Sequence, residues 1–362
     1  LEKGCVPSVL SHPDMSLHQF SAIPKKTITL LTPRRTPAVS TPYGNSNSGI
    51  SVFSSYGFQK VSNKDYILYT HKLYPDIVVA LADMPYGSKP GTKRLPKMAN
   101  RTKDWVGEML QTKTEDQAIF APVLPIDAKE QADYLNYISN EAADNISGIA
   151  FYDSKLLLDI PTSVKISHIA RLSLDEPSSP LRILEQISLG MDLFTVPFIE
   201  SATDAGIALT FQFPGPLPQK DATMETDLFP LGIDMWSSAH SCSLDPIVKS
   251  CCCYCCKFHH QAYVQHLLST NEMLGWVLLQ IHNHRVLFDF FTSIRKSISE
   301  GRFETDLREF SESYRHEWLE MTRQAHRTKG NNFNSESPSQ PTKNHATRVK
   351  YDVKIPDQNE KM

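Results

Sequence analysis

The chain has 362 residues, of which 40% are hydrophobic and 21% are charged. This composition is typical of a globular protein with one large core or two smaller ones, and the lack of any run of about 18 consecutive apolar residues predicts no integral membrane segment. The formal net charge of -3 excludes a broadly basic surface, so contact with nucleic acid would need local basic patches or a partner.

Residues 1–117 are predicted to form a β-rich first part of the fold. Apolar and β-branched runs at 27–31, 50–54 and 76–82 are separated by Pro, Gly, Ser and Asn, which favour turns. The chain begins with Leu1 where an initiating Met is expected. We therefore expect an N-terminally truncated fold.

Strands and helices alternate in residues 118–232, which predicts βα units. The predicted strands are residues 119–124, 146–152, 166–172, 193–196 and 207–211. One predicted helix covers 129–141, and a second begins at Ser179 and Pro180 and ends at Gly190. This spacing indicates parallel strands, and about eight of them suit a TIM-type (β/α)8 barrel better than the alternative, an open doubly wound sheet.

Residues 233–302 are predicted to form a helical subdomain. Prolines interrupt the connection at 213–240, and residues 228–236 are expected to pack the subdomain onto the barrel. Residues 258–268 predict a short helix, and Ser-x-x-Glu at 269–272 reads as a capping box that begins a second one.

The last part of the chain, residues 303–362, is predicted to hold a C-terminal helix and a disordered tail. Before it, apolar residues repeat at helical spacing from Leu274 to Ile294, which we interpret as core packing with a share available to a partner. From Ala325 onward, polar residues dominate and the apolar periodicity stops, which predicts disorder.

Six of the seven cysteines lie within residues 242–256. Three of them, followed after a helical interval by one histidine, offer the three thiolates and one imidazole of a tetrahedral zinc site. The predicted ligands are Cys251, Cys253, Cys256 and His282. Two helical arms, each roughly 15 Å long, form a hairpin that returns the histidine to the cysteines. Cys252 and Cys255 remain alternative ligands.

A disulfide cluster and a set of palmitoylation sites are the competing interpretations of these cysteines. They lie too close together to cross-link a long chain, and we expect no secretory signal before them. No hydrophobic membrane segment lies beside them, which disfavours palmitoylation. The pattern therefore favours zinc and a reducing, intracellular setting.

This segment resembles the zinc-binding segment of the tRNA-guanine transglycosylases. The resemblance rests on Cys-x-Cys-Tyr-x-Cys-Lys at 251–257, Ala-Tyr at 262–263, His-Leu-Leu at 266–268, Asn-Glu at 271–272, Leu-Gly at 274–275 and Ile-His-Asn at 281–283. It extends more weakly through residues 118–212. It implies a modified barrel with a late subdomain built around one structural zinc, and exchange of guanine for queuine at the wobble position of certain tRNAs.

Catalytic members of that family carry an aspartate nucleophile at the end of a Gly-x-Asp-x-Phe-Asp string, where a carboxylate can attack the ribose and later depart. Residues 190–195 read Gly-Met-Asp-Leu-Phe-Thr, so Thr195 occupies that position. A threonine hydroxyl is un-ionised at neutral pH and would leave poorly. The resemblance therefore implies no catalytic residue, and Asp192 is expected to point to the opposite face of the strand.

Other family positions are also replaced. The Pro-Thr-Arg and second Arg that help hold tRNA become Ile199-Glu200-Ser201 and Asp204, which works against phosphate binding. The Gly-rich strand ends expected around guanine become residues 151–154 and 172–175. The stretch Ala-Leu-Thr-Phe at 208–211, after Gly206, instead resembles the non-catalytic accessory subunits of the eukaryotic enzymes. Trp236 and residues 251–257 and 274–283 look most similar to fungal members.

The resemblance implies a catalytically inactive barrel that forms a heterodimer with the catalytic queuine tRNA-ribosyltransferase subunit and reaches tRNA through the complex. The zinc hairpin and the helix after it are the expected interface. The implied location is the cytoplasm, with peripheral association with the mitochondrial outer membrane. Two alternatives stay open: an active transglycosylase that uses Asp192, Glu200 or Asp204, and a stand-alone zinc-dependent RNA-binding protein.

Overall fold

The structure, a computed structural model, describes residues 15–34, 39, 44–54, 57–84, 90–114, 117–160, 168–216 and 228–315. The tail expected from Ala325 lies outside these residues, as do parts of the predicted strand at 166–172 and of the connection at 213–240. The disorder of the tail therefore stays a prediction.

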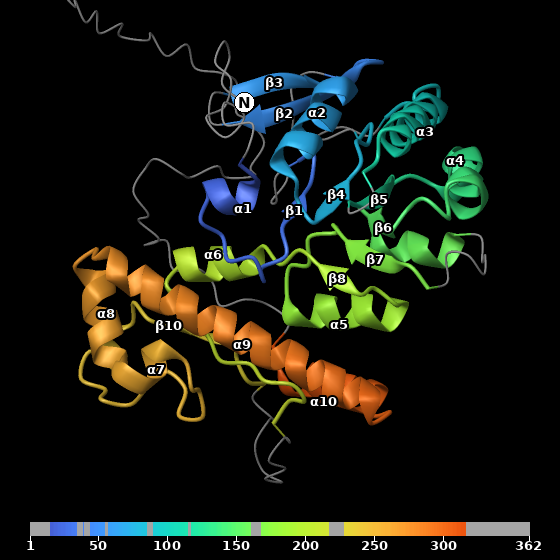
Figure 1. Ribbon diagram of the computed structural model, residues 1–362. Coiled ribbons are helices and arrows are strands. Elements are labelled where there is room, and N and C mark those ends of the chain that lie inside the picture. Colours follow the sequence, from blue (N-terminus) through green and yellow to red (C-terminus); the bar gives the residue numbers. More distant parts are fainter. Residues whose placement is uncertain are drawn as a thin grey trace, which may run out of the picture.

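Within the described residues, six parallel strands form one curled sheet (Figure 1). Their order across the sheet is β1 (Leu30–Leu31), β4 (Ile77–Val79), β5 (Ala118–Val123), β6 (Gly148–Phe151), β7 (Ala170–Ser173) and β8 (Leu193–Phe194). Neighbours pair in parallel, and the order across the sheet follows the order along the chain. A doubly wound sheet reverses its order at a switch point, so this topology argues against that alternative and for the wall of a barrel.

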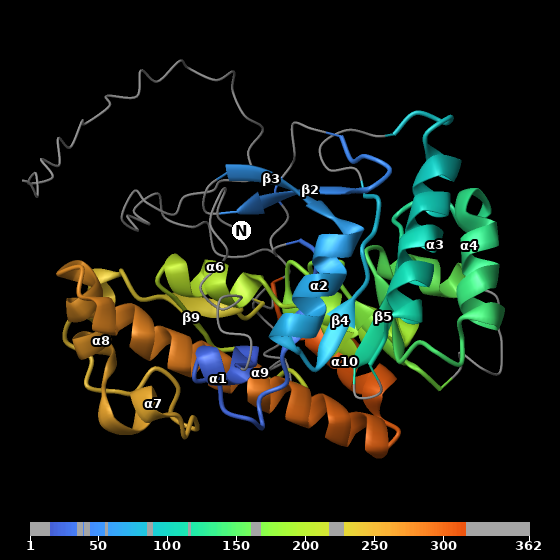
Figure 2. The ribbon, with the colours of Figure 1, turned by 45° about the horizontal axis from the view of Figure 1, so that its top comes forward.

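Helical segments connect successive strands of the sheet and lie along its outer side (Figure 2), while one further helix precedes the first strand and another follows the last. The α-helices of this part are α1 (Leu17–Phe20), α2 (Asn63–Leu73), α3 (Leu95–Gln111), α4 (Ala132–Asn136), α5 (Pro180–Leu189) and α6 (Phe198–Asp204). Shorter turns are the 3-10 segments η2 (Ala128–Gln131) and η4 (Ser154–Asp159) and the π-helical η3 (Tyr137–Glu141). Because η2, α4 and η3 follow one another without a break, they confirm the helix predicted at 129–141.

Helix α5 begins and ends where the sequence predicts. Ser179 is its N-cap, and the hydroxyl oxygen accepts from the backbone N–H of Arg182, with Pro180 in the first turn. Gly190 ends the helix in a left-handed conformation with a φ of 101°, which glycine adopts without the steric cost of a side chain. The chain then enters β8, so this cap sets the path to Thr195.

The part of the chain predicted to be β-rich also holds, among the described residues, the short helix α1 and the longer helices α2 and α3. Its strands β2 (Gly49–Ser54) and β3 (Gly57–Ser62) form an antiparallel hairpin between β1 and α2. Helix α3 turns an apolar face inward, with Trp105, Val106 and Met109 buried. The sequence analysis did not anticipate these helices, although α3 carries a helical apolar repeat.

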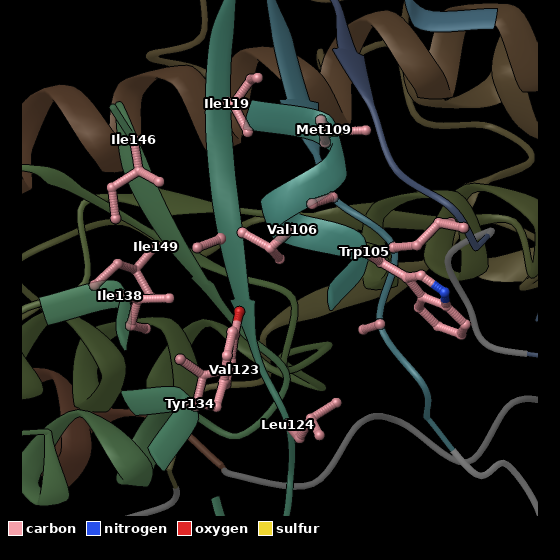
Figure 3. Close-up of a cluster of buried hydrophobic side chains, with 14 of the residues drawn as sticks. Trp105, Val106, Met109, Ile119, Val123, Leu124, Tyr134, Ile138, Ile146 and Ile149 are labelled. Atoms are coloured by element: carbon pink, nitrogen blue, oxygen red, sulfur yellow. The ribbon is translucent and has the colours of Figure 1, made fainter. Parts of the chain in front are cut away.

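The main core lies between α3, the helical segment around α4, and the sheet (Figure 3). It contains Trp105, Val106, Met109, Ile119, Val123, Leu124, Tyr134, Ile138, Ile146 and Ile149, all of them buried. The hydroxyl of Tyr134 donates to the carbonyl of Pro122 at 2.6 Å, so the one polar atom of this aromatic side chain is satisfied inside the core.

Strand β9 (Ile207–Leu209) corrects one expectation. It pairs antiparallel with β10 (Gly232–Asp234) and does not join the parallel sheet. The expectation that 207–211 continues the parallel βα units is therefore wrong. The physical reason lies in helix α9 (Met273–Ser299), whose Asn283 accepts from the N–H of Leu209 and donates to the carbonyl of Ile207. Side chains of a helix thus bind backbone groups of β9 that a neighbouring strand would otherwise pair.

The predicted helical subdomain consists of several short helices beside α9. They are η5 (Ser238–His240), which packs on α8, and α7 (Tyr254–Phe258) and α8 (Gln261–Ser269), which pack on α9; α10 (Phe303–Ser313) follows α9. Trp236 and Met235, just after β10, belong to the apolar cluster of the subdomain, in agreement with the expected packing of residues 228–236. Although α9 has 27 residues, no described helix is both long and apolar enough to cross a membrane.

The predicted capping box at 269–272 is wrong. Ser269 is the last residue of α8, and its hydroxyl donates back to the carbonyl of Gln265. Asn271 adopts a left-handed φ of 57°, and α9 begins only at Met273, with Glu272 as an N-cap that makes no side-chain capping bond. The chain reverses direction through this left-handed residue, so the N-cap of α9 falls three residues later than the motif suggested.

The edge strand β1 is held by one carboxylate. Asp76 accepts from the backbone N–H of Thr29 at 2.7 Å, from the Thr29 hydroxyl at 2.8 Å and from His18 Nε2 at 3.2 Å. These donors, the Thr29 N–H first among them, lower the pKa of Asp76 from 3.8 to about 2. A two-residue strand is too short to hold itself at the sheet edge, so we assign its anchoring to this carboxylate.

Replacement of Asp76 by asparagine is expected to lower the free energy of unfolding by about 1 kcal/mol at pH 7, because the carboxylate is half exposed and its bonds are partly replaced by water. A lowered pKa stabilises the folded state above the ordinary value of 3.8 and loses that effect as pH falls toward about 2. Urea unfolding of wild type and Asp76→Asn should therefore converge from pH 5 to pH 2. A gap that does not change with pH, or an equal gap for exposed Asp104→Asn, would contradict this role.

Candidate metal centre

Four side chains from three parts of the subdomain meet at one point. Cys251 lies just before α7, Cys253 is the N-cap of α7, Cys256 lies within it, and His282 lies in the middle of α9. Cys253 has an extended backbone, and its sulfur accepts from the N–H of Cys256 at 3.3 Å. The same local bond that begins α7 therefore turns these two thiols toward one point.

The donor atoms have the spacing of a tetrahedral site. The Sγ atoms lie 3.7 Å (Cys251), 3.7 Å (Cys253) and 3.3 Å (Cys256) from Nδ1 of His282. All four donor atoms lie within 4.8 Å of one another. A tetrahedral metal with sulfur at about 2.3 Å and nitrogen at about 2.0 Å separates these two donors by about 3.5 Å. The nitrogen–sulfur distances of the four residues therefore fit a tetrahedral metal ion.

The histidine presents Nδ1 to the thiols because its other nitrogen is bonded. Nε2 lies 2.9 Å from the carbonyl oxygen of Leu209, and a carbonyl can only accept. The ring proton therefore sits on Nε2, and the lone pair of Nδ1 faces the sulfurs. His282 is fully buried, Cys253 and Cys256 are buried, and Cys251 is half-buried.

The remaining cysteines do not join the group. Cys252 and Cys242 are exposed, and Cys255 packs in the apolar cluster, where burial raises the pKa of its thiol to about 12. Burial also raises the pKa of Cys256, so a bound cation would have to displace the proton of that thiol. The six cysteines among the described residues are free thiols, which argues against the disulfide interpretation for them.

The position that the resemblance assigns to the nucleophile lies at the carboxyl end of β8. Thr195 directly follows this strand, and its N–H and hydroxyl both lie near the carbonyl of Ser173, at 3.2 and 3.4 Å. Asp192 precedes β8 and accepts from the N–H of Arg171 at 2.9 Å. Instead of facing away within the strand, as expected, Asp192 lies at its amino end. Sites in parallel barrels form at the carboxyl ends of strands, so Asp192 is badly placed to replace the nucleophile.

Comparison with known proteins agrees with this arrangement. A family model described as Queuine tRNA-ribosyltransferase matches residues 9–316. The chain belongs to this family. The accessory subunit 2 of queuine tRNA-ribosyltransferase from Schizosaccharomyces pombe is 37% identical over 306 residues, which cover 83% of this chain and 67% of that protein. The proteins of the same name from Drosophila persimilis and Homo sapiens are 29% and 28% identical, over 79% and 71% of this chain and 70% and 71% of their own lengths. The resemblance inferred from residues 251–283 is thereby confirmed.

In this member of the queuine tRNA-ribosyltransferase family, the altered strand ends of β6 and β7 bind each other. The hydroxyl of Ser154 donates to the carboxylate of Asp175 at 2.8 Å, and the backbone N–H of Ser154 lies 3.3 Å from the same oxygen. Gln186 of α5 donates to the carbonyl of Asp175 at 3.0 Å. The carboxylate at the end of β7 is therefore used to join two strand ends.

The two other alternative carboxylates lie on α6. Glu200 is exposed in its first turn, and Asp204 is its last residue. The backbone carbonyl of Asp204 accepts from the indole N–H of Trp276 on α9 at 3.4 Å. The structure does not bring Asp192 to these two residues, because Asp192 lies at the opposite end of β8.

Sequence analysis missed two residues that support the metal centre without being ligands. Leu209 supplies the carbonyl that orients His282, and Asn283 binds the strand on which that carbonyl lies. A backbone carbonyl leaves no trace in a sequence pattern. The asparagine does, since it follows the histidine directly in the Ile-His-Asn string.

Proposed function

We propose that the chain is the non-catalytic subunit of a tRNA-guanine transglycosylase heterodimer and supports exchange of guanine for queuine in tRNA. The observation that carries this proposal is a complete Cys3His cluster in a chain whose nucleophile position holds Thr195. The printed names of the relatives, accessory subunits of queuine tRNA-ribosyltransferase, support it. A scaffold kept for catalysis alone would be expected to keep the carboxylate.

The ion that we propose for the cluster is one zinc per chain, because three thiolates and one imidazole are the ligands that zinc takes in closed structural sites. The ion would join α7 to α9 and leave no position open for a water or substrate. The role of the ion is therefore structural.

We also propose that the six parallel strands belong to a modified (β/α)8 barrel, because their order across the sheet never reverses.

Thr195 supports the proposed lack of catalysis through its surroundings as well as its chemistry. Its hydroxyl lies 3.4 Å from a backbone carbonyl, an acceptor that cannot remove its proton. Attack on a ribose would need a base to take that proton, and the hydroxyl would depart poorly from the resulting ether. The Thr195 side chain is therefore unsuited to act as the nucleophile.

A face of α9 supports the proposed partner. Leu274, Val277, Ile281 and Phe288 are exposed, while Leu278, Val286, Phe290 and Ile294 of the same helix are buried. The exposed four fall at heptad-related positions and so lie on one stripe, about 21 Å long. The stripe predicted mainly as core is thus divided between two faces. We propose that the exposed face binds the catalytic subunit.

The isolated chain is expected to show no guanine exchange and to form no covalent adduct with tRNA, because no carboxylate stands at the Thr195 position. Mixing it with the catalytic subunit should give a complex on size-exclusion chromatography and exchange of labelled guanine in the pooled fractions. Thr195→Asp should not restore activity, since Ser201 and Asp204 still replace the arginines that hold tRNA.

The same measurements separate the alternatives. A denaturation-resistant protein–RNA adduct formed by this chain alone would refute the proposal in favour of an active transglycosylase. Binding of tRNA with no complex and no gain of activity on mixing would favour the stand-alone RNA-binding protein.

A further inference from the structure

Asn283, the residue after the metal-site histidine, is fully buried and uses its whole amide group. Its Oδ1 accepts from the N–H of Leu209 at 2.8 Å. Its Nδ2 donates to the carbonyl of Ile207 at 3.0 Å and to the hydroxyl of Thr203 at 2.9 Å. One side chain of α9 therefore binds both β9 and the end of α6.

Leu209 is bound at both of its backbone groups by consecutive residues of α9. Its N–H donates to Asn283, and its carbonyl accepts from Nε2 of His282 at 2.9 Å. In a strand, the N–H and C=O of one residue point to the same side, so both groups of Leu209 face the helix. The position of this carbonyl is thus set by the asparagine as well as by the strand.

The Leu209 carbonyl matters because its bond to Nε2 sets the orientation of the His282 imidazole. A ligating histidine keeps its ring orientation and its tautomer through the bond of its second nitrogen, and loss of such an outer contact typically weakens metal binding by about 10- to 100-fold. If Leu209 shifts, Nε2–H loses its acceptor in a buried site. The ring can then turn, and Nδ1 no longer points at the three sulfurs.

We propose that Asn283 is a positioning residue of the metal centre: it fixes Leu209, whose carbonyl binds Nε2 of His282 and so keeps Nδ1 directed at the three thiol sulfurs. This inference rests on the proposed zinc centre and goes beyond it. It makes the affinity for the ion depend on a side chain that is not a ligand.

Two tryptophans provide a second, independent connection between the same segments. The indole N–H of Trp236 donates to the carbonyl of Ala205 at 3.0 Å, and that of Trp276 donates to the carbonyl of Asp204. Their rings lie 6.1 Å apart. Because these bonds hold the end of α6 without Asn283, a variant at 283 can keep the subdomain attached while it loses the orientation of the histidine.

The decisive variant is Asn283→Leu in the full chain. Leucine has nearly the same size and a higher helix propensity, so α9 itself is not weakened. Removal of the amide leaves the N–H of Leu209 and the carbonyl of Ile207 unpaired. We expect Zn²⁺ to bind at least about tenfold more weakly in competition with a chelator. We also expect an altered visible ligand-field spectrum when Co²⁺ is bound in its place, since that spectrum reports the geometry of the donor atoms.

Phe290→Leu is the matched control. Phe290 is buried on the same helix two turns later, in the apolar cluster that also contains Leu209, Phe211 and Phe310. Unlike Asn283, it makes no hydrogen bond to the backbone of Leu209. Phe290→Leu should lower the melting temperature and leave Zn²⁺ affinity and the Co²⁺ spectrum as in wild type.

Thr203→Val removes one acceptor of Asn283 and should weaken Zn²⁺ binding about threefold or more. This variant tests the positioning role if Asn283→Leu does not fold.

The outcomes separate the two levels of inference. Wild-type Zn²⁺ affinity and Co²⁺ spectrum in Asn283→Leu would overturn the positioning role while leaving the zinc centre intact. Equal weakening by Phe290→Leu would overturn it as well, because general loosening would then explain the effect. A wild-type chain that binds no Zn²⁺ would instead overturn the proposed centre.

Discussion

Cys253→Ala is expected to release the ion and to unfold the hairpin of α7 and α8, because this residue has two roles. Its sulfur is one of the four donor atoms, and it is also the N-cap acceptor for the N–H of Cys256. Structural zinc sites contribute on the order of 10 kcal/mol of apparent binding free energy to the folded state, far more than one cap. The zinc content should therefore fall from one per chain to nearly none, with a large loss of thermal stability.

Elemental analysis after gel filtration, together with thermal unfolding followed by circular dichroism, checks this expectation. Cys252→Ala is the matched control, since Cys252 is the exposed neighbour of two ligands. It should keep one zinc and the wild-type melting curve. Full zinc in Cys253→Ala would move the ligand set to the neighbouring cysteines, and full zinc with all three thiols removed would eliminate the site.

The metal cluster was predictable because its chemistry is concentrated in the sequence. Five of the six residues at 251–256 are cysteines, three of them at a spacing that suits a metal site, and a histidine after a helical return fits the fourth place. The cap and stop of α5 were predictable for the same reason, since Ser179, Pro180 and Gly190 act on their own local backbone. Features that depend on residues within one turn of a helix can be predicted without knowledge of the rest of the fold.

What could not be predicted depends on contacts between distant segments. Strand β9 has the composition of a parallel strand, but Asn283, 74 residues after Leu209, binds its backbone. The turn between α8 and α9 had a capping-box pattern, yet the reversal needed a left-handed residue at Asn271. Helix α2 was missed because two of its three buried residues, Asn63 and Thr70, are polar, so that only the neighbouring strands reveal its buried face. Tertiary contacts override local propensity in each case.

Phe288→Asp is expected to weaken pairing with the catalytic subunit by at least about tenfold, because burial of a new carboxylate at an interface adds a desolvation cost to the loss of an aromatic contact. Phe288 is 59% exposed at the middle of α9, on the stripe with Ile281 and Val277, and the Arg285 guanidinium lies 5.4 Å from its ring. An exposed aromatic beside an arginine is typical of residues that dominate binding. Lys257→Glu on α7 should also weaken pairing, but its loss of affinity should be smaller than that of Phe288→Asp, because a charge at the rim of an interface contributes little to affinity.

Leu158→Asp is the matched control, because Leu158 is 73% exposed on η4, in a different part of the fold. Calorimetric titration of each variant with the catalytic subunit, after circular dichroism has shown that it is folded, gives the change in affinity. Leu158→Asp and removal of the residues after Ala325 should leave that affinity unchanged.

A specific interface buries on the order of 1,200 to 2,000 Å², more than the stripe offers alone, so we expect the neighbouring surface of α7 and α8 to take part. If removal of the tail abolishes the complex while Phe288→Asp and Lys257→Glu bind as wild type does, the interface lies elsewhere and the proposed role of the exposed stripe of α9 is wrong.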